Sequence, residues 1–271
     1  MTAASPPSSP QAEITEHFQP IPLRFGSSPL SRVAFKLRCV VDLQLGSIWS
    51  FIGPKLALLK GNLLDVGCGE MPYRTFLPKH IDYVGIDVPQ AGAFSMQGHE
   101  EIISFDGYHI PFPDATFDTV LCTEVLEHSP EPAALIAEIG RVLKPGGTLI
   151  ATVPFSARVH YAPHDFHRFS KYALAKMLGA FPDVSIEERG NDIAVLANKM
   201  VVLAVRMIHP SRWSPVRWPL LLLLVPIALC FLLLAHLTMA MKLGSLDDPL
   251  GYGLTACKEL DASKERSGEA V

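Results

Sequence analysis

Residues 62–73 of the chain read NLLDVGCGEMPY, and this stretch decides the fold. A short apolar run ends in Asp65 and breaks into Gly67 and Gly69, a pattern typical of a buried strand that turns sharply towards a helix. Glycine suits such a turn because it reaches backbone angles that other residues resist and lets a ligand lie against the main chain. The stretch therefore predicts a nucleotide-type binding site.

The pattern of an apolar strand followed by a loop repeats along the chain. Strands are predicted at residues 83–88, 101–106, 117–123, 148–153 and 184–187. Helices are predicted at residues 31–60 with an interruption near 53–54, at 73–77, at 130–143 behind a Ser129 cap, and at 171–178. This alternation predicts an α/β, Rossmann-like, doubly wound parallel sheet that binds its ligand at the carboxyl ends of the strands.

The composition excludes some partners and indicates a compartment. The 271 residues carry a formal net charge of -4, so the chain lacks the basic field that nucleic acid binding requires. Its five cysteines are an odd number without disulfide or metal-ligand spacing, which predicts reduced thiols facing the cytosol. Residues 1–10 lack the basic start and apolar run of a secretory signal, so the catalytic part is expected in the cytoplasm.

Residues 218–241 differ in character from the rest of the chain. They contain no charged residue, and as a helix they would extend roughly 36 Å, enough to cross a bilayer. Arginines at 206, 212 and 217 and tryptophans at 213 and 218 precede or open the stretch, an interfacial signature on a side that would be cytoplasmic. The sequence therefore predicts attachment to a membrane.

Several motifs together carry a resemblance to a known family. They are LDVGCG at 64–69, VGID at 84–87, FD at 105–106, IPFPDATFDTV at 110–120, LEH at 126–128 and RVLKPGG at 141–147. In this order and spacing the chain resembles the class I S-adenosylmethionine (SAM) methyltransferases, most closely the type 11 methyltransferase domain family. The resemblance covers roughly residues 60–190 and 250–258. It implies a seven-stranded, mostly parallel sheet with an antiparallel last strand.

The resemblance also implies SAM as the cofactor and assigns residues to it. The glycine turn would lie under the methionine moiety and ribose, and Asp65 would accept from the ammonium group. Asp87 is placed to accept from the ribose hydroxyls, as an acid does in dinucleotide folds, and Asp106 would face the adenine. The implied cofactor-binding residues are Asp65, Gly67, Cys68, Gly69, Asp87, Val88, Asp106, Gly107 and Thr123.

Residues 160–169 follow the fifth strand, where the resemblance places acceptor-binding groups. His164 or His167 is a candidate general base on an acceptor hydroxyl, and Arg168 a candidate holder of an anionic group. His160 and His128 are further candidates for the acceptor site. A hydrogen-bonded loop without catalytic duty is an equal alternative, because methyl transfer needs mainly alignment. The spacing matches no compact metal motif, so no metal site is predicted.

The final predicted strand, at 250–258, constrains how the apolar stretch meets a membrane. If this strand joins the sheet, both flanks of the stretch lie on one side, which favours monotopic attachment by a hairpin or a re-entrant segment bent at Pro226. The alternatives are pairing with residues 193–208, burial against another subunit, and a single span that excludes the final strand from the sheet.

The predicted organisation has five parts. These are a disordered lead-in at 1–30, the methyltransferase domain at 31–190, the hydrophobic helical insertion at 191–249, the last strand at 250–258 and a polar tail at 259–271. The expected function is transfer of a methyl group from SAM to a small or lipid-linked acceptor at the cytoplasmic face of a membrane. The alternatives are a membrane-tethered SAM-binding module without turnover and a nicotinamide-dependent oxidoreductase.

Overall fold

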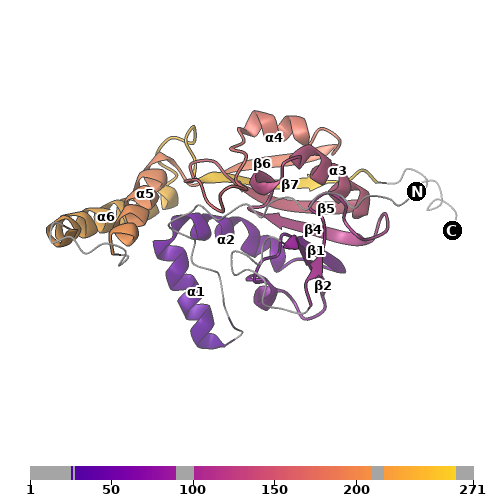
Figure 1. Ribbon diagram of the computed structural model, residues 1–271, viewed down its shortest axis with the longest axis horizontal. Helices are drawn as coiled ribbons and strands as arrows, with labels where there is room; N and C mark the ends of the chain where they lie inside the picture. The colour runs from indigo at the N-terminus through magenta and orange to yellow at the C-terminus, as the bar shows by residue number, and fades with distance from the viewer. Residues whose placement is uncertain (1–25, 27, 90–100, 209–216, 261–271) are drawn as a thin grey trace, which may run out of the picture.

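The computed structural model describes residues 26, 28–89, 101–208 and 217–260. Most of the predicted lead-in and nearly all of the polar tail lie outside these residues, as do Arg212 and Trp213. The described part forms a seven-stranded sheet with helices on both faces and a helical arm at one end (Figure 1).

The sheet has the strand order β3-β2-β1-β4-β5-β7-β6. All neighbouring pairs are parallel except those of β7, which runs antiparallel to both β5 and β6. The predicted mostly parallel sheet with an antiparallel last strand is therefore confirmed. The strands are β1 (Asn62–Val66), β2 (Asp82–Asp87), β3 (Ile103–Ser104), β4 (Phe117–Thr123), β5 (Leu143–Pro154), β6 (Asp183–Arg189) and β7 (Gly251–Cys257).

Alternate side chains of the central strands feed two separate cores, because a strand points successive residues to opposite faces. Leu64 and Val120 join the core under α3 (Pro132–Val142) and α4 (Lys171–Met177). Leu63 and Leu121 join the core under α2 (Leu43–Leu56) on the other face. Both faces of the parallel sheet are covered, which explains why its strands are nearly continuous apolar runs.

Several predicted boundaries were wrong; the strand predicted at 101–106, for example, is only Ile103–Ser104. The helical segment breaks at Asp42, between α1 (Pro29–Val41) and α2, because the Asp42 carboxylate accepts from the Leu45 N–H and caps a new helix. Pro54 lies in the last turn of α2, which ends at Leu56. Ser129 does not cap α3, whose N-cap is Glu131; it ends the 3-10 helix η3 (Leu126–His128) instead. β5 begins at Leu143, ahead of the predicted start.

The apolar insertion folds as a hairpin of α5 (Asp192–Ile208) and α6 (Arg217–Ala240), which projects from one end of the sheet (Figure 1). Its two ends are fastened together beside the sheet. Asn191 donates to the Leu243 carbonyl at 2.7 Å, and the Asp192 N–H donates to the Ser245 carbonyl at 3.1 Å. Of the predicted alternatives, the structure shows pairing with residues 193–208. A single span that leaves the last strand out of the sheet is wrong, because β7 lies between β5 and β6.

Candidate functional site

A cavity of about 340 Å³ lies at the carboxyl ends of β1, β2 and β4. This is the edge at which a doubly wound sheet binds its ligands. The lining falls into a half that follows β1 to β3 and a half that follows β4 and β5. It comprises Gly67, Asp87, Val88, Phe105, Asp106, Gly107, Tyr108, Glu124, Val125, His128, Ser129, Pro130, Leu135, Tyr161, His164 and Phe166.

Gly67 forms the corner where β1 leaves the sheet. Its φ of 68° lies in the left-handed region, and a Cβ there would stand 2.4 Å from Val125 Cγ2. Both the backbone angle and the space therefore require glycine. The corner brings bare main chain to the wall of the cavity, as the sequence pattern predicts for a nucleotide-type ligand.

Asp87, at the end of β2, is buried and faces the same cavity. Its Oδ2 accepts from the Gly69 N–H and its Oδ1 from the Val88 N–H, both at 2.7 Å. Burial raises the pKa of Asp87, and the two backbone N–H groups oppose that effect. Because a carboxylate oxygen has more than one lone pair, Asp87 keeps acceptor capacity for a ligand hydroxyl. Gly69 itself lies behind Asp87, outside the lining.

Asp65 is buried at the end of β1, behind the cavity lining. Its Oδ2 accepts from the Tyr83 hydroxyl at 2.7 Å, whereas its Oδ1 has no hydrogen-bond partner among the described residues. Burial raises the pKa of Asp65 to about 7. The side chain of Cys68 is buried beside Gly85 and does not line the cavity. An orphaned acidic oxygen next to a glycine corner fits a cofactor that carries a positive charge.

Asp106 and Gly107 line the cavity, but the Asp106 carboxylate already accepts hydrogen bonds from the residues that follow it. Its Oδ1 accepts from the N–H groups of Tyr108 and His109, at 2.7 and 2.6 Å. These hydrogen bonds lower the pKa of Asp106. The carboxylate shapes this loop, and Tyr108 takes a place in the wall that the sequence did not predict.

The opposite half of the cavity carries His128 from η3 and His164 from the loop after β5. Tyr161 and Phe166 lie beside them in the lining. The loop is held against η3, since the N–H groups of Phe166 and His167 both donate to the Glu127 carbonyl. The structure thus brings His128 and the 160–169 segment together, as the sequence predicts for an acceptor site.

Seven of the predicted site residues lie outside the cavity lining: Asp65, Cys68 and Gly69, described above, and also Thr123, His160, His167 and Arg168. Arg168 cannot serve as a free anion holder in this arrangement, because its guanidinium binds both oxygens of the buried Asp165, at 2.5 and 2.7 Å. Thr123 ends β4, and Glu124 and Val125, which follow it, line the cavity in its place. Glu124 has a φ of 55°, which turns the chain into the cavity wall.

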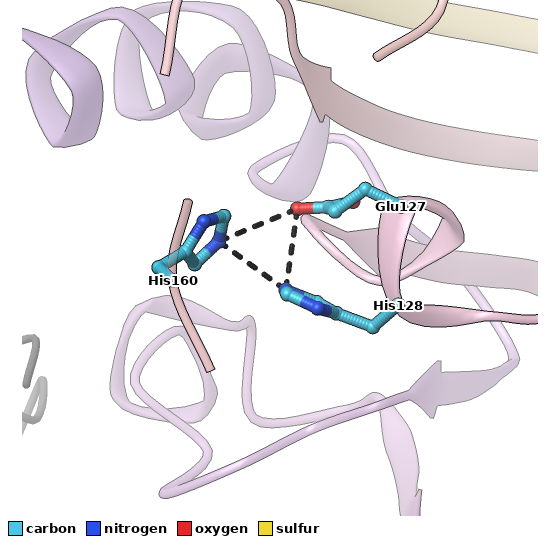
Figure 2. A group of neighbouring side chains, drawn as sticks. All are labelled: Glu127, His128 and His160. Carbon is cyan, nitrogen blue, oxygen red and sulfur yellow. Dashed lines mark hydrogen bonds and ion pairs between the residues drawn. The ribbon is translucent and has the colours of Figure 1, made fainter. Parts of the chain in front are cut away.

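His160 belongs instead to a compact group with Glu127 and His128 (Figure 2). The Nε2 atoms of the two histidines are 3.2 Å apart, and Glu127 Oε1 lies 3.6 Å from His128 Nε2 and 3.8 Å from His160 Nε2. Glu127 is fully buried. Burial and the neighbouring His160 lower the pKa of His128 to about 4, and burial raises the pKa of Glu127 well above its usual range.

Several lining residues carry no signal in the sequence. Val125, Tyr108, Tyr161 and Phe166 are ordinary apolar or aromatic side chains in loops, and the loops reach the cavity only through the packing of η3 and the 160–169 segment. Tyr161 has a left-handed φ of 54°. The sequence does not predict this angle, because glycine or asparagine is the usual residue in the left-handed conformation. The histidine-rich composition of the segment was the one available indication.

Comparison with known proteins gives the domain a class. Residues 64–151 match the family model described as "Methyltransferase domain". The chain is 35% identical over 108 residues to the ubiquinone biosynthesis O-methyltransferase of Hahella chejuensis, and 34% over 126 residues to the fatty-acid O-methyltransferase of Mycolicibacterium smegmatis. These matches cover 36% and 43% of this chain, and 45% and 44% of the two relatives. The chain thus matches less than half the length of these relatives.

Two solved structures share the fold. A SAM-dependent methyltransferase from Archaeoglobus fulgidus aligns with a TM-score of 0.50 at 16% identity, over 83% of this chain and 99% of that one. The [4+2]-cyclase SpnF also aligns with a TM-score of 0.50, at 20% identity, over 90% of this chain and all of that one. The family match and the relatives identify residues 64–151 as a class I SAM-dependent methyltransferase domain, with S-adenosylmethionine as its cofactor.

Proposed function

We propose that the chain is a membrane-attached methyltransferase that transfers a methyl group from SAM to a small or lipid-linked acceptor. The observation that carries this proposal is the cavity itself. A glycine corner and the buried Asp87 form one half, and the other half carries His128 and His164. A cofactor half and an acceptor half that share one cavity suit direct transfer between two bound molecules.

The residues of the cavity would act mainly by positioning. SAM supplies a methyl group on a sulfonium, which is electrophilic without further activation. Gly67 and Asp87 would hold the nucleoside and methionine portions, with Asp65 behind them. Tyr161 and Phe166 would exclude water, and His164 is the lining residue that would accept a proton from an acceptor hydroxyl. His167 lies outside the lining, which leaves His164 as the better candidate for that role.

The α5–α6 hairpin supports attachment to a membrane. Trp218–Ala240 is long and apolar enough to cross a bilayer by length and composition. The most apolar 18 residues of this helix have a mean hydropathy of 2.8, and only 22% of them are buried. A core helix of a water-soluble domain would be covered by protein, whereas Leu222 is 77% exposed and Leu233 73% exposed. Because both ends of the hairpin return to the sheet, the hairpin favours monotopic attachment from one side.

The α1 helix offers a second surface of the same kind. Phe35 packs inward against Trp49 and Phe76, with ring centroids 5.0 and 4.8 Å away. Leu30, Val33, Leu37, Val40 and Val41 are all exposed, and their helical spacing places them together on the side away from Phe35. Arg32, Lys36 and Arg38 flank this stripe, a pattern that suits anionic lipid head groups.

The two surfaces are connected, since His236 of α6 donates to the Val40 carbonyl of α1 at 2.8 Å. A lipid surface that takes up α6 would therefore also meet the end of α1. The similarity to a ubiquinone biosynthesis O-methyltransferase and to a fatty-acid O-methyltransferase favours a lipid-linked acceptor. The methyltransferase domain would lie on the cytoplasmic face, where SAM is available.

The test is incubation of the purified full chain, in detergent or vesicles, with methyl-labelled SAM and fractionated lipid and cytosolic extracts. We expect label in a lipid fraction and none with a heat-treated protein. Binding of S-adenosylhomocysteine without label in any fraction would favour a SAM-binding module without turnover. Tighter binding of NAD than of S-adenosylhomocysteine would favour an oxidoreductase.

A further inference from the structure

The group formed by Glu127, His128 and His160 has the dimensions of a metal site (Figure 2). Its three facing atoms are separated by 3.2, 3.6 and 3.8 Å. Atoms at these separations share a common point about 2 Å from each, which is the length of a bond from zinc to a histidine nitrogen or a carboxylate oxygen.

The hydrogen bonds of the rings fix which nitrogen atoms are available. His128 Nδ1 lies 2.6 Å from the His164 carbonyl, which accepts only, so Nδ1 carries the proton. His160 Nδ1 lies 3.1 Å from the Arg158 carbonyl and 3.3 Å from the Asp165 carboxylate, and it also carries the proton. In the neutral rings both Nε2 atoms are therefore acceptors, and they face one another.

Glu127 gives the independent observation that the group is incomplete. Its side chain is fully buried, and neither Oε1 nor Oε2 has a hydrogen-bond partner among the described residues. Three acceptors thus converge on one point without a donor between them. Burying a carboxylate in this way is costly unless a cation or a proton completes the arrangement.

The surroundings match those of metal-binding histidines. Such histidines donate their other ring N–H to a backbone carbonyl or a carboxylate, which fixes the orientation of the ring. His128 has the His164 carbonyl in this role, and His160 has Asp165, which Arg168 holds with two hydrogen bonds. Asp165 and Arg168 therefore orient His160 from outside the group.

We propose that Glu127, His128 and His160 bind a divalent metal ion of the zinc class. Two imidazoles and one carboxylate favour zinc or another first-row transition metal over Mg²⁺ or Ca²⁺, which prefer oxygen ligands throughout. Three protein ligands leave a coordination position for water or for an oxygen of a bound molecule. His128 belongs both to the group and to the cavity lining, so the ion adjoins the acceptor half of the cavity.

Sequence spacing alone did not predict this site, because Glu127 and His128 are adjacent and His160 lies 32 positions later. The competing explanation is a proton in place of the metal, carried by Glu127 beside two neutral imidazoles. The two explanations differ in whether the protein takes up a metal. The metal proposal does not depend on methyl transfer, since binding is measured without an acceptor.

The test uses the full chain without an affinity tag, purified in detergent, loaded with Zn²⁺ and dialysed. We expect about one equivalent of zinc per chain by elemental analysis. Co²⁺ in place of Zn²⁺ is expected to give the intense visible absorption of a four- or five-coordinate site. Glu127→Gln and His160→Ala are expected to weaken metal binding on the order of 100-fold.

His164→Ala is the matched control, because His164 lines the cavity but is not one of the three residues of the group. The zinc content of this variant is expected to stay at the wild-type level. Binding of S-adenosylhomocysteine, measured on each sample, reports whether a variant is folded and tests the proposed function separately. Wild-type protein that binds S-adenosylhomocysteine yet retains no zinc and gives no Co²⁺ absorption overturns the metal site. Equal metal content in wild type, Glu127→Gln and His160→Ala also overturns it.

Discussion

The carboxyl edge of the sheet and the α5–α6 hairpin depart from the usual distribution of side chains in opposite directions. The sheet edge buries acids, with Asp65, Asp87 and Glu127 all nearly inaccessible. The hairpin exposes leucines, such as Leu222 and Leu233. Each departure costs free energy in an isolated domain. At the sheet edge, acidic groups are removed from water, and on the hairpin, apolar side chains are exposed to water. Both costs are recovered if a ligand completes the first region and a bilayer covers the second.

The strongest way to break this comparison is to place charge on the hairpin. Leu222→Lys with Leu233→Lys puts two ammonium groups on one face of α6. At about 3 kcal/mol per leucine-to-lysine change in a bilayer, we expect a loss of about 6 kcal/mol in membrane partitioning. Flotation of the protein with lipid vesicles measures the effect.

The matched control for the hairpin is binding of S-adenosylhomocysteine in detergent, which should be unchanged because no residue of α6 lines the cavity. If the double variant floats with vesicles as wild type does, the hairpin is not the membrane anchor.

At the sheet edge, Asp87→Ala removes the acceptor of the Gly69 N–H and a candidate ribose ligand. Loss of these charge-assisted hydrogen bonds should weaken S-adenosylhomocysteine binding on the order of 100-fold, about 3 kcal/mol. Calorimetric titration gives the dissociation constant. Asp82→Ala, an exposed acid at the start of the same strand, serves as the control and should bind as wild type does. Unchanged affinity in Asp87→Ala would remove the residue from the cofactor site.

Asp65 sharpens the comparison through pH. Its pKa in the folded protein is raised from 3.8 to about 7 by burial, so the stability that this group contributes is fully present below the unfolded pKa and is lost progressively as pH rises from there to about 7. In the absence of cofactor, Asp65→Asn should therefore stabilise the protein at pH 8, on the order of 4 kcal/mol, and have little effect at pH 4. Thermal unfolding of both proteins at the two pH values tests this. If Asp65→Asn raises the stability of the protein equally at the two pH values, then Asp65 does not become a buried charge as the pH rises.

The smallest expected effect concerns α1. Lys36→Gln removes one basic group beside the exposed apolar stripe and should lower affinity for anionic vesicles by about 1 kcal/mol. Vesicles of neutral lipid provide the comparison, since their binding should not change. High salt should abolish the difference between the two proteins, because it screens surface charge. Equal binding to anionic vesicles at low salt would exclude α1 from the lipid surface.

Sequence reasoning succeeded where local pattern and burial coincide. The glycine corner, the strand ends at Asp65 and Asp87 and the apolar insertion were all predicted, because periodicity and composition express them directly. Sequence reasoning failed where a specific side-chain hydrogen bond or ion pair overrides the preference of the local sequence. Asp42 caps α2 and moves the helix break away from Pro54, and Arg168 is held by Asp165 and so withdrawn from the cavity.

By itself, the sequence determined the α/β sheet, the cofactor turn and the presence of a bilayer-length apolar helix, because each depends on residues that are neighbours along the chain. The tertiary structure decided which distant residues meet. The Glu127 backbone carbonyl holds the 160–169 loop against η3 and brings His160 to His128, while β7 returns the hairpin to the sheet. Such contacts depend on how elements pack in three dimensions, and no spacing in the chain encodes them.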